Sequence, residues 1–208
     1  MHKNNISSFY YHDAGFRYLV ERSKRKNIRI SILTDEEDCV LVKAPYRISD
    51  VLIKKEIDMH EKWIIKHINE NRKIIDEVHK QGILSEKDIS VLRNRAKEYI
   101  PHRVSYYAEL MGIKYNSIFI RAQNTRWGSC SSKGNLNFNC LLMLTPPEVI
   151  DSVIVHELAH RIHMNHSKAF YEVIYTYYPE YKKWNNWLKE NGKSILLRMK
   201  MGEKSIVR

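Results

Sequence analysis

A helix-start signal at Thr145-Pro146-Pro147-Glu148 constrains the fold more than any other stretch of the sequence. Threonine at the N-cap, proline at the first helical position and glutamate at the third would satisfy the free amide groups of a first helical turn. The apolar residues that follow recur at helical spacing, and we expect the helix to continue to about Ile162. Their density predicts a helix that is largely buried.

Two histidines inside this predicted helix have the spacing of a metal site. His156 and His160 are four residues apart, so their imidazoles lie one turn apart on the same helix face. Glu157 lies beside them, where a carboxylate can take a proton from the attacking water and deliver it to the leaving group. The motif predicts a hydrolase with a zinc ion and with Glu157 as its catalytic base.

A third ligand is expected because catalytic zinc sites keep three protein ligands and leave one position open. His166 follows His156 by ten residues and fits the spacing of the extended motif with a third histidine. Glu172 and Glu180 are the alternatives, since other zinc hydrolases take a glutamate from a downstream helix. We expect His166 to complete the ligand set for one zinc ion.

The patterns elsewhere in the chain predict both helices and strands. In chain order they indicate a β-hairpin over residues 9–44, a long basic helix over 49–79, a helix over 85–110, paired strands over 117–121 and 135–141, and helices over 168–178 and 180–190. Ser85-Glu86-Lys87-Asp88 resembles a capping box, and Gly192 is expected to end the last helix. The fold class is therefore α+β.

The chain carries a formal net charge of +11, which predicts attraction to polyanions. The cluster Arg22-Ser23-Lys24-Arg25-Lys26 fits either a nucleic-acid patch or a solvated basic surface. Residues 1–5 contain no apolar run of signal-peptide length, and no later stretch reaches the length of a membrane span. We therefore expect a cytoplasmic protein without a membrane partner.

Several motifs together resemble a known family. They are Asn124-Thr125-Arg126-Trp127-Gly128-Ser129-Cys130, Asn135-Leu136-Asn137-Phe138-Asn139, the histidine motif and Asn165-His166-Ser167-Lys168-x-Phe170. With Arg22–Lys26 and Val42–Pro45 they are similar to YgjP-like metallopeptidase-type hydrolases, which are relatives of SprT-like proteases, over about residues 15–190. The resemblance implies His156, His160 and His166 as zinc ligands and Glu157 as the base.

The resemblance also implies a zincin-like catalytic domain with an active-site helix and a small antiparallel sheet, preceded by the β-hairpin and long helices. We expect the N-terminal hairpin and basic helix over residues 1–80, the catalytic domain over 81–192 and a basic tail over 193–208. The leading interpretation is a zinc metallopeptidase. The alternatives are a nucleotide or phosphoanhydride hydrolase with the same metal site, and a DNA-associated protease with a basic binding surface.

Arg126 and Trp127 are the candidate substrate-binding residues. They precede the strand that, in zinc peptidases of this general architecture, lies beside the cleft and pairs with an extended peptide. In the nucleotide alternative, Arg126 with Lys133 or Lys168 would clamp phosphates. Core packing for Trp127 and a structural ion pair for Arg126 are equally compatible with the sequence.

Overall fold

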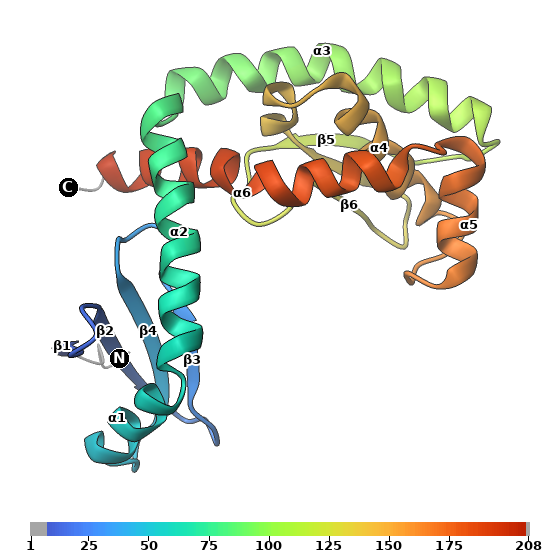
Figure 1. Ribbon diagram of the computed structural model, residues 1–208. Coiled ribbons are helices and arrows are strands. Elements are labelled where there is room, and N and C mark those ends of the chain that lie inside the picture. Colours follow the sequence, from blue (N-terminus) through green and yellow to red (C-terminus); the bar gives the residue numbers. More distant parts are fainter. Residues whose placement is uncertain (1–7, 207–208) are drawn as a thin grey trace. The chain divides into compact units, whose positions relative to one another are not determined.

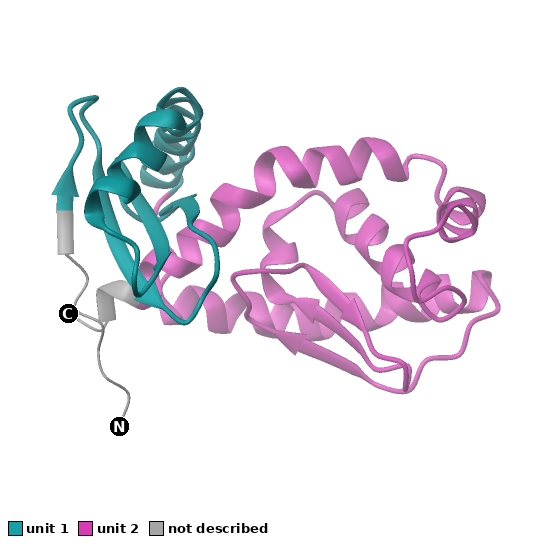
Figure 2. Cartoon of the chain, turned by 90° about the horizontal axis from the view of Figure 1, so that it is seen from below, with its two compact units in different colours: residues 1–81 teal, residues 82–208 magenta. Residues whose placement is uncertain are grey.

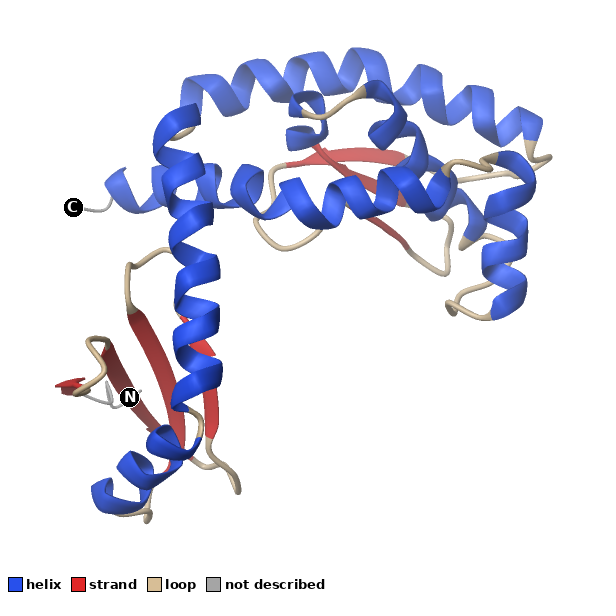
Figure 3. Cartoon of the chain, in the orientation of Figure 1, coloured by secondary structure: helices blue, strands red, loops and turns tan. Residues whose placement is uncertain are grey.

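Both halves of the chain contain helices and strands, which confirms the α+β class (Figure 3). The computed structural model describes residues 8–206. Residues 1–5, in which we found no signal-peptide run, lie outside the described part. The chain divides into two units, Met1–Gln81 and Gly82–Arg208 (Figure 2), and each has its own apolar core.

The first unit contains a four-stranded sheet with the order β1-β2-β4-β3 (Figure 1). Its strands are β1 (Ser8–Tyr11), β2 (Arg17–Ser23), β3 (Arg29–Ile32) and β4 (Cys39–Pro45). β3 and β4 pair antiparallel and form the predicted hairpin, while β2 pairs in parallel with β4 and antiparallel with β1. The hairpin is thus part of a larger mixed sheet with β1 and β3 at its edges.

Two helices follow this sheet where the sequence predicted one. α1 (Asp50–Met59) begins after Ser49, whose hydroxyl accepts a hydrogen bond from the Leu52 N–H group at 3.3 Å. His60 ends it, because its backbone (φ −103°, ψ 7°) leaves the helical range, and α2 (Glu61–Gln81) starts directly afterwards. Apolar periodicity continues across this one-residue break, so it did not indicate two helices.

The core of the first unit is formed by apolar residues of the sheet and of both helices. It includes the buried side chains of Val20, Val40, Val42, Ile53, Ile57 and Ile64. Buried and less buried residues alternate along β2 and along much of β4, as in a sheet with one covered face.

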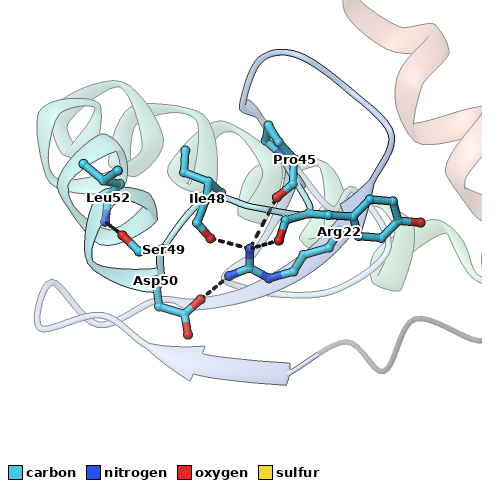
Figure 4. A network of polar contacts seen from close by, with 7 residues as sticks. Arg22, Pro45, Ile48, Ser49, Asp50 and Leu52 are labelled. Carbon is cyan, nitrogen blue, oxygen red and sulfur yellow. Dashed lines mark hydrogen bonds and ion pairs between the residues drawn. The ribbon is translucent and has the colours of Figure 1, made fainter.

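Arg22, part of the basic cluster, ties the end of β4 to the start of α1 (Figure 4). Its guanidinium donates hydrogen bonds to the carbonyl oxygens of Pro45 and Ile48 and forms an ion pair with Asp50. A cation occupied in this way has a structural role, which separates Arg22 from the other basic residues of its cluster.

The second unit begins with the long helix α3 (Glu86–Leu110). The predicted capping box is confirmed, because the Ser85 hydroxyl accepts from the Asp88 N–H group and the Asp88 carboxylate accepts from the Ser85 N–H group. Pro101 lies inside this helix without ending it. The capping residues therefore set the position at which the helix begins.

The sheet of the second unit has the order β5-β7-β6. Its strands are β5 (Ile118–Arg121), β6 (Gly128–Cys130) and β7 (Leu136–Asn139). β5 and β7 pair as predicted, but they run parallel, and β6 is the antiparallel partner of β7. The prediction of an antiparallel sheet is therefore wrong, because the sheet is mixed. The sequence pattern did not predict β6, because this strand has only three residues and begins with glycine.

α4 (Pro147–Ala159) is the buried helix that the start signal predicts, although the signal acts differently. Thr145 is not the N-cap, because its hydroxyl donates to the Leu142 carbonyl at 2.8 Å and ends the 3-10 helix η1 (Cys140–Leu144). Pro146 takes the N-cap position instead. The helix also ends three residues before the predicted end.

α5 (Lys168–Tyr177) and α6 (Tyr181–Ile206) complete the second unit. The predicted helix end at Gly192 and the basic tail from residue 193 are wrong, because α6 continues to Ile206. Ile195 and Met199 are buried in the core of this unit, so apolar packing keeps the segment helical. Among the described helices, none combines the length and the apolar character needed to cross a bilayer.

A partly buried ion pair joins α3 to α4. Arg103 donates hydrogen bonds of 2.9 and 2.6 Å to the Asp151 carboxylate, and the Tyr107 hydroxyl donates a third at 3.2 Å. Burial, with the charge of Asp151, raises the pKa of Tyr107 to about 12, so this hydroxyl stays a donor at neutral pH. The network fixes α4 against α3.

Candidate metal centre

α4 places two predicted ligands and the predicted base next to one another. His156 and His160 lie one turn apart, with ring centroids separated by 4.9 Å. Glu157 is 5% exposed, and seven of the ten residues before it in α4 are buried, five of them apolar. Packing on the core therefore holds this motif in a rigid helix.

His166 reaches the same place from the turn between α4 and α5. The next residue, Ser167, caps α5 by accepting a hydrogen bond from the Phe170 N–H group. The His166 ring lies 5.1 Å from that of His156 and 4.8 Å from that of His160. The fully buried Phe170 ring contacts all three imidazoles at centroid distances of 4.6, 4.9 and 5.0 Å. The three predicted ligands thus converge on one point.

The spacing of the three histidines fits a single tetrahedral ion. One nitrogen from each ring lies within 4.8 Å of the others, and the Nε2 atoms of His156 and His166 are 3.2 Å apart. Two nitrogens that bind one tetrahedral zinc are roughly 3.3 Å apart. Within residues 8–206, no other group of histidine, cysteine or acidic side chains has a comparable arrangement.

The outward nitrogens of two predicted ligands are held by hydrogen bonds. His160 Nδ1 lies 3.1 Å from the His163 carbonyl oxygen, and His156 Nδ1 lies 2.9 Å from the Tyr181 hydroxyl. With a proton on Nδ1, each ring keeps its Nε2 lone pair available for a metal. Burial raises the pKa of Tyr181, so the hydroxyl remains protonated at neutral pH.

Tyr181 is a site residue that the sequence did not reveal. It begins α6 and lies 25 residues after His156. The chain has thirteen tyrosines, and nothing in the local spacing sets this one apart from those that only pack. Its role depends on how α6 meets α4, which is a tertiary contact.

Burial shifts the pKa values of the motif so that the neutral form of each side chain is favoured. Burial, together with the neighbouring rings of His160 and His166, lowers the pKa of His156 to about 4. Burial also lowers the pKa of His160. Burial raises the pKa of Glu157 to about 8, against the opposing charge of Arg126. At neutral pH the imidazoles of His156 and His160 are therefore in the neutral form that binds metal.

Strand β6 passes close to Glu157 at a glycine. A Cβ atom on Gly128 would lie 2.5 Å from Oε1 and 2.8 Å from Cγ of Glu157. Such distances are far below van der Waals contact, so a side chain at this position would displace the carboxylate. Gly128 belongs to the site because its missing side chain leaves room for the Glu157 carboxyl group. A glycine in the sequence does not by itself indicate this role.

Arg126 lies on a loop that a buried asparagine holds in place. The Asn139 side chain donates to the carbonyl oxygens of Gln123 (2.6 Å) and Arg126 (2.9 Å) and accepts from the Leu141 N–H group. Arg126 itself is exposed, and its charge lowers the pKa of Glu157. Its backbone is thus fixed, while its side chain is open to solvent.

A cavity of about 180 Å³ opens beside His156 and Glu157. Trp127, Val153 and Leu188 contribute apolar walls, and no lysine or arginine lines it. Trp127 also packs on α6, where a Cβ atom on Gly192 would lie 3.0 Å from the indole ring. Of the two candidate substrate-binding residues, the structure brings Trp127 to this cavity and leaves Arg126 outside its lining.

The alternative ligands lie elsewhere. Glu172 is exposed and paired with Lys168 at 3.6 Å, and Glu180 is exposed and paired with Lys183 at 3.3 Å. Neither carboxylate belongs to the histidine group. Among the candidates, only His166 joins the two histidines of α4.

Comparison with protein families agrees with this site. Residues 86–191, just over half of the chain, match the family model described as the YgjP-like metallopeptidase domain. A metal-dependent hydrolase of the metallopeptidase type is thus the class to which fold, site and family point. The chain belongs to the YgjP-like family, as its motifs led us to expect.

Among solved structures, the crystal structure of the metallopeptidase zymogen of Pyrococcus abyssi abylysin is similar to part of the chain. The TM-score is 0.40 at 18% sequence identity, over 44% of this chain and 93% of that chain. The comparison with curated proteins finds no match.

Proposed function

We propose that this protein is a zinc-dependent peptidase in which His156, His160 and His166 hold the ion and Glu157 is the general base. One observation carries the proposal: three imidazole nitrogens lie within 4.8 Å of one another, directly beside a buried carboxyl group. Catalytic zinc sites use three such ligands, and imidazole suits zinc well.

When bound, zinc would supply Lewis acidity, which polarises a carbonyl group and makes water easier to deprotonate. Glu157 would accept the proton of the attacking water and return it to the leaving amine. Gly128 lets the carboxyl group approach the site closely, and Phe170 keeps the imidazoles in place. A cation in the site would lower the raised pKa of Glu157, so that it acts as a base at neutral pH.

Two features support a peptide as substrate. β6 is an edge strand beside Glu157, so an extended peptide can pair with its free side through main-chain hydrogen bonds. The cavity next to it has apolar walls and a volume of about 180 Å³, which suits one uncharged side chain. The peptide would then place one of its carbonyl groups next to Glu157.

The nucleotide alternative lacks an assembled phosphate clamp. Transfer at phosphorus needs cations near the reacting group. The cavity lining contains none, and Arg126, whose charge acts on Glu157, lies outside this lining. Lys168 is almost fully exposed and paired with Glu172, and Lys133 is exposed. This arrangement favours peptides over nucleoside triphosphates as substrates.

An activity screen tests the proposal. Purified protein would be offered casein and nucleoside triphosphates, with and without a chelator, in parallel with the Glu157→Gln variant. We expect casein cleavage that the chelator stops and that the variant lowers at least about 100-fold while it retains the metal. Full activity of Glu157→Gln would exclude Glu157 as the base. Hydrolysis of triphosphates alone would exclude the peptidase.

A further inference from the structure

β3 exposes a free backbone edge in the first unit. It pairs only with β4. The hydrogen bond from the Leu33 N–H group to the Cys39 carbonyl (2.8 Å) shows which residues of β3 direct their backbone groups towards β4. Backbone groups alternate in direction along an antiparallel strand. Ser31 therefore faces β4, while Ile30 and Ile32 direct their N–H and C=O groups outward. No described group bonds to these outward groups.

A pocket of about 300 Å³ lies beside this edge, and residues of β3, α1 and α2 line it. Ile28, directly before β3, and Ile30 within it form an apolar wall, because alternate side chains of an extended chain point the same way. Trp63, which is 43% exposed, forms another wall, and Glu56 and His60 complete the lining. An exposed tryptophan over a pocket is typical of a docking surface.

Basic residues without acidic partners surround the start of β3. Within the described chain, no ion pair is formed by four of these residues, Lys24, Arg25, Lys26 and Arg29. Arg22 in the same cluster differs, because it forms an ion pair with Asp50. The Nε atom of Arg25 is buried and lacks a hydrogen-bond partner. A buried donor without an acceptor is destabilising, so an acceptor from a ligand would be favourable here.

We propose that the edge of β3 docks an extended, acid-rich segment of another polypeptide as an added strand. Its backbone would pair with Ile30 and Ile32, one apolar side chain would enter the pocket at Trp63, and its carboxylates would meet the basic residues at the start of β3. A free strand edge and an apolar pocket serve a peptide and not the phosphate backbone of a nucleic acid. The surface belongs to the first unit, apart from the metal centre in the second.

Fluorescence anisotropy with a labelled octapeptide tests this proposal. The peptide has valines at two alternate positions flanked by glutamates, and the protein is the full chain with Glu157→Gln, so that bound peptide is not cut. We expect saturable binding that weakens as salt increases. A matched peptide with lysine in place of each glutamate should bind at least about tenfold more weakly.

Two variants separate the backbone edge from the charges. Ile32→Pro removes an outward N–H group without breaking a bond to β4, and Ile32 does not line the pocket. We expect at least about a tenfold loss of affinity for the acidic peptide. The double variant Lys26→Glu and Arg29→Glu should cause a similar loss. The double variant Arg95→Glu and Lys97→Glu on α3, which makes the same change of charge in the second unit, should leave the affinity unchanged.

Circular dichroism would verify that each variant is folded. If Ile32→Pro does not fold, the affinities of the charge variants still test the proposal. Absence of peptide binding by the parent protein would overturn the proposal. The proposal would also be overturned if Ile32→Pro and the double variant Lys26→Glu and Arg29→Glu both bound the acidic peptide as tightly as the parent protein does. Two further results would also overturn it: binding of an oligonucleotide to the basic residues with no binding of peptide, or self-association of the chain that Ile32→Pro abolishes.

Discussion

At the scale of single residues, Tyr181 offers a direct test of how the ligands are held. Its hydroxyl contacts His156 Nδ1 at 2.9 Å, and Tyr181→Phe would leave that nitrogen buried without a partner. We expect the zinc affinity to fall roughly 10- to 100-fold, as is usual when a partner of a ligand is lost. Competition with a chromophoric chelator measures this affinity. Tyr175→Phe, at an exposed position, is the control.

Unchanged zinc affinity in Tyr181→Phe would mean that the hydrogen bond does not orient His156. A loss of equal size in Tyr175→Phe would point to a general effect of removing a hydroxyl group.

Glu157 gives the metal-free protein a characteristic dependence of stability on pH. Its folded pKa of about 8 lies above the ordinary value of 4.5, so the folded state holds a proton that the unfolded state releases. This contribution to stability is fully present below about pH 4.5 and is lost progressively as the pH rises towards 8. Glu157→Gln lacks this dependence.

Denaturant unfolding of the metal-free wild type and Glu157→Gln at pH 5.5 and pH 8 checks this sign. The variant should gain stability relative to the wild type as the pH increases, by up to about 1.4 kcal/mol for each pH unit. His156 and His160 are present in both proteins, so the effect of their lowered pKa values largely cancels in the difference. A difference that stays constant with pH would show that Glu157 is not protonated in the folded state.

The residues of the site differ in how far the sequence could reveal them. His156, Glu157 and His160 are readable because their relation is local, and a helix of known period converts spacing into geometry. Tyr181 and Gly128 act across tertiary contacts between α6 and α4 and between β6 and α4, which no local pattern encodes.

At the scale of elements, the approach of β6 to α4 positions the base. Gly128→Ala would place a Cβ atom 2.5 Å from Oε1 of Glu157, so the carboxyl group would have to move. We expect kcat for casein cleavage to fall at least about 100-fold while zinc binding persists, because in the proposed mechanism Glu157 is the base and not a ligand. Steady-state kinetics and metal content measure both effects.

Ser129→Ala on the same strand is the control for Gly128→Ala, and we expect it to keep most of the activity. If Gly128→Ala retained full kcat, the close contact between β6 and Glu157 would have no part in catalysis.

The elements that the sequence predicted well are those with local signals. The capping box at Ser85 set the start of α3, whereas Gly192 wrongly suggested the end of α6. Glycine in a helix costs about 1 kcal/mol relative to alanine, which makes it a reasonable stop signal. Here the indole of Trp127 lies against Gly192, and burial of Ile195 and Met199 carries the helix further.

At the scale of the whole molecule, the two units carry different features. The second contains the three histidines and the residues that match the family, 86–191. The first contains the free edge of β3 and the basic residues at the start of that strand, Lys24, Arg25, Lys26 and Arg29. The net charge of +11 keeps nucleic-acid binding as a prediction, to be measured by salt-dependent retention on DNA.

The central claim is that three histidines of the second unit hold one metal ion, and metal analysis of the purified protein tests it most directly. We predict one zinc per chain in the wild type and in His163→Ala, whose side chain is outside the ligand set, and a sharp loss in His166→Ala. A wild type without metal, or a His166→Ala variant that retains one zinc per chain, would contradict the account.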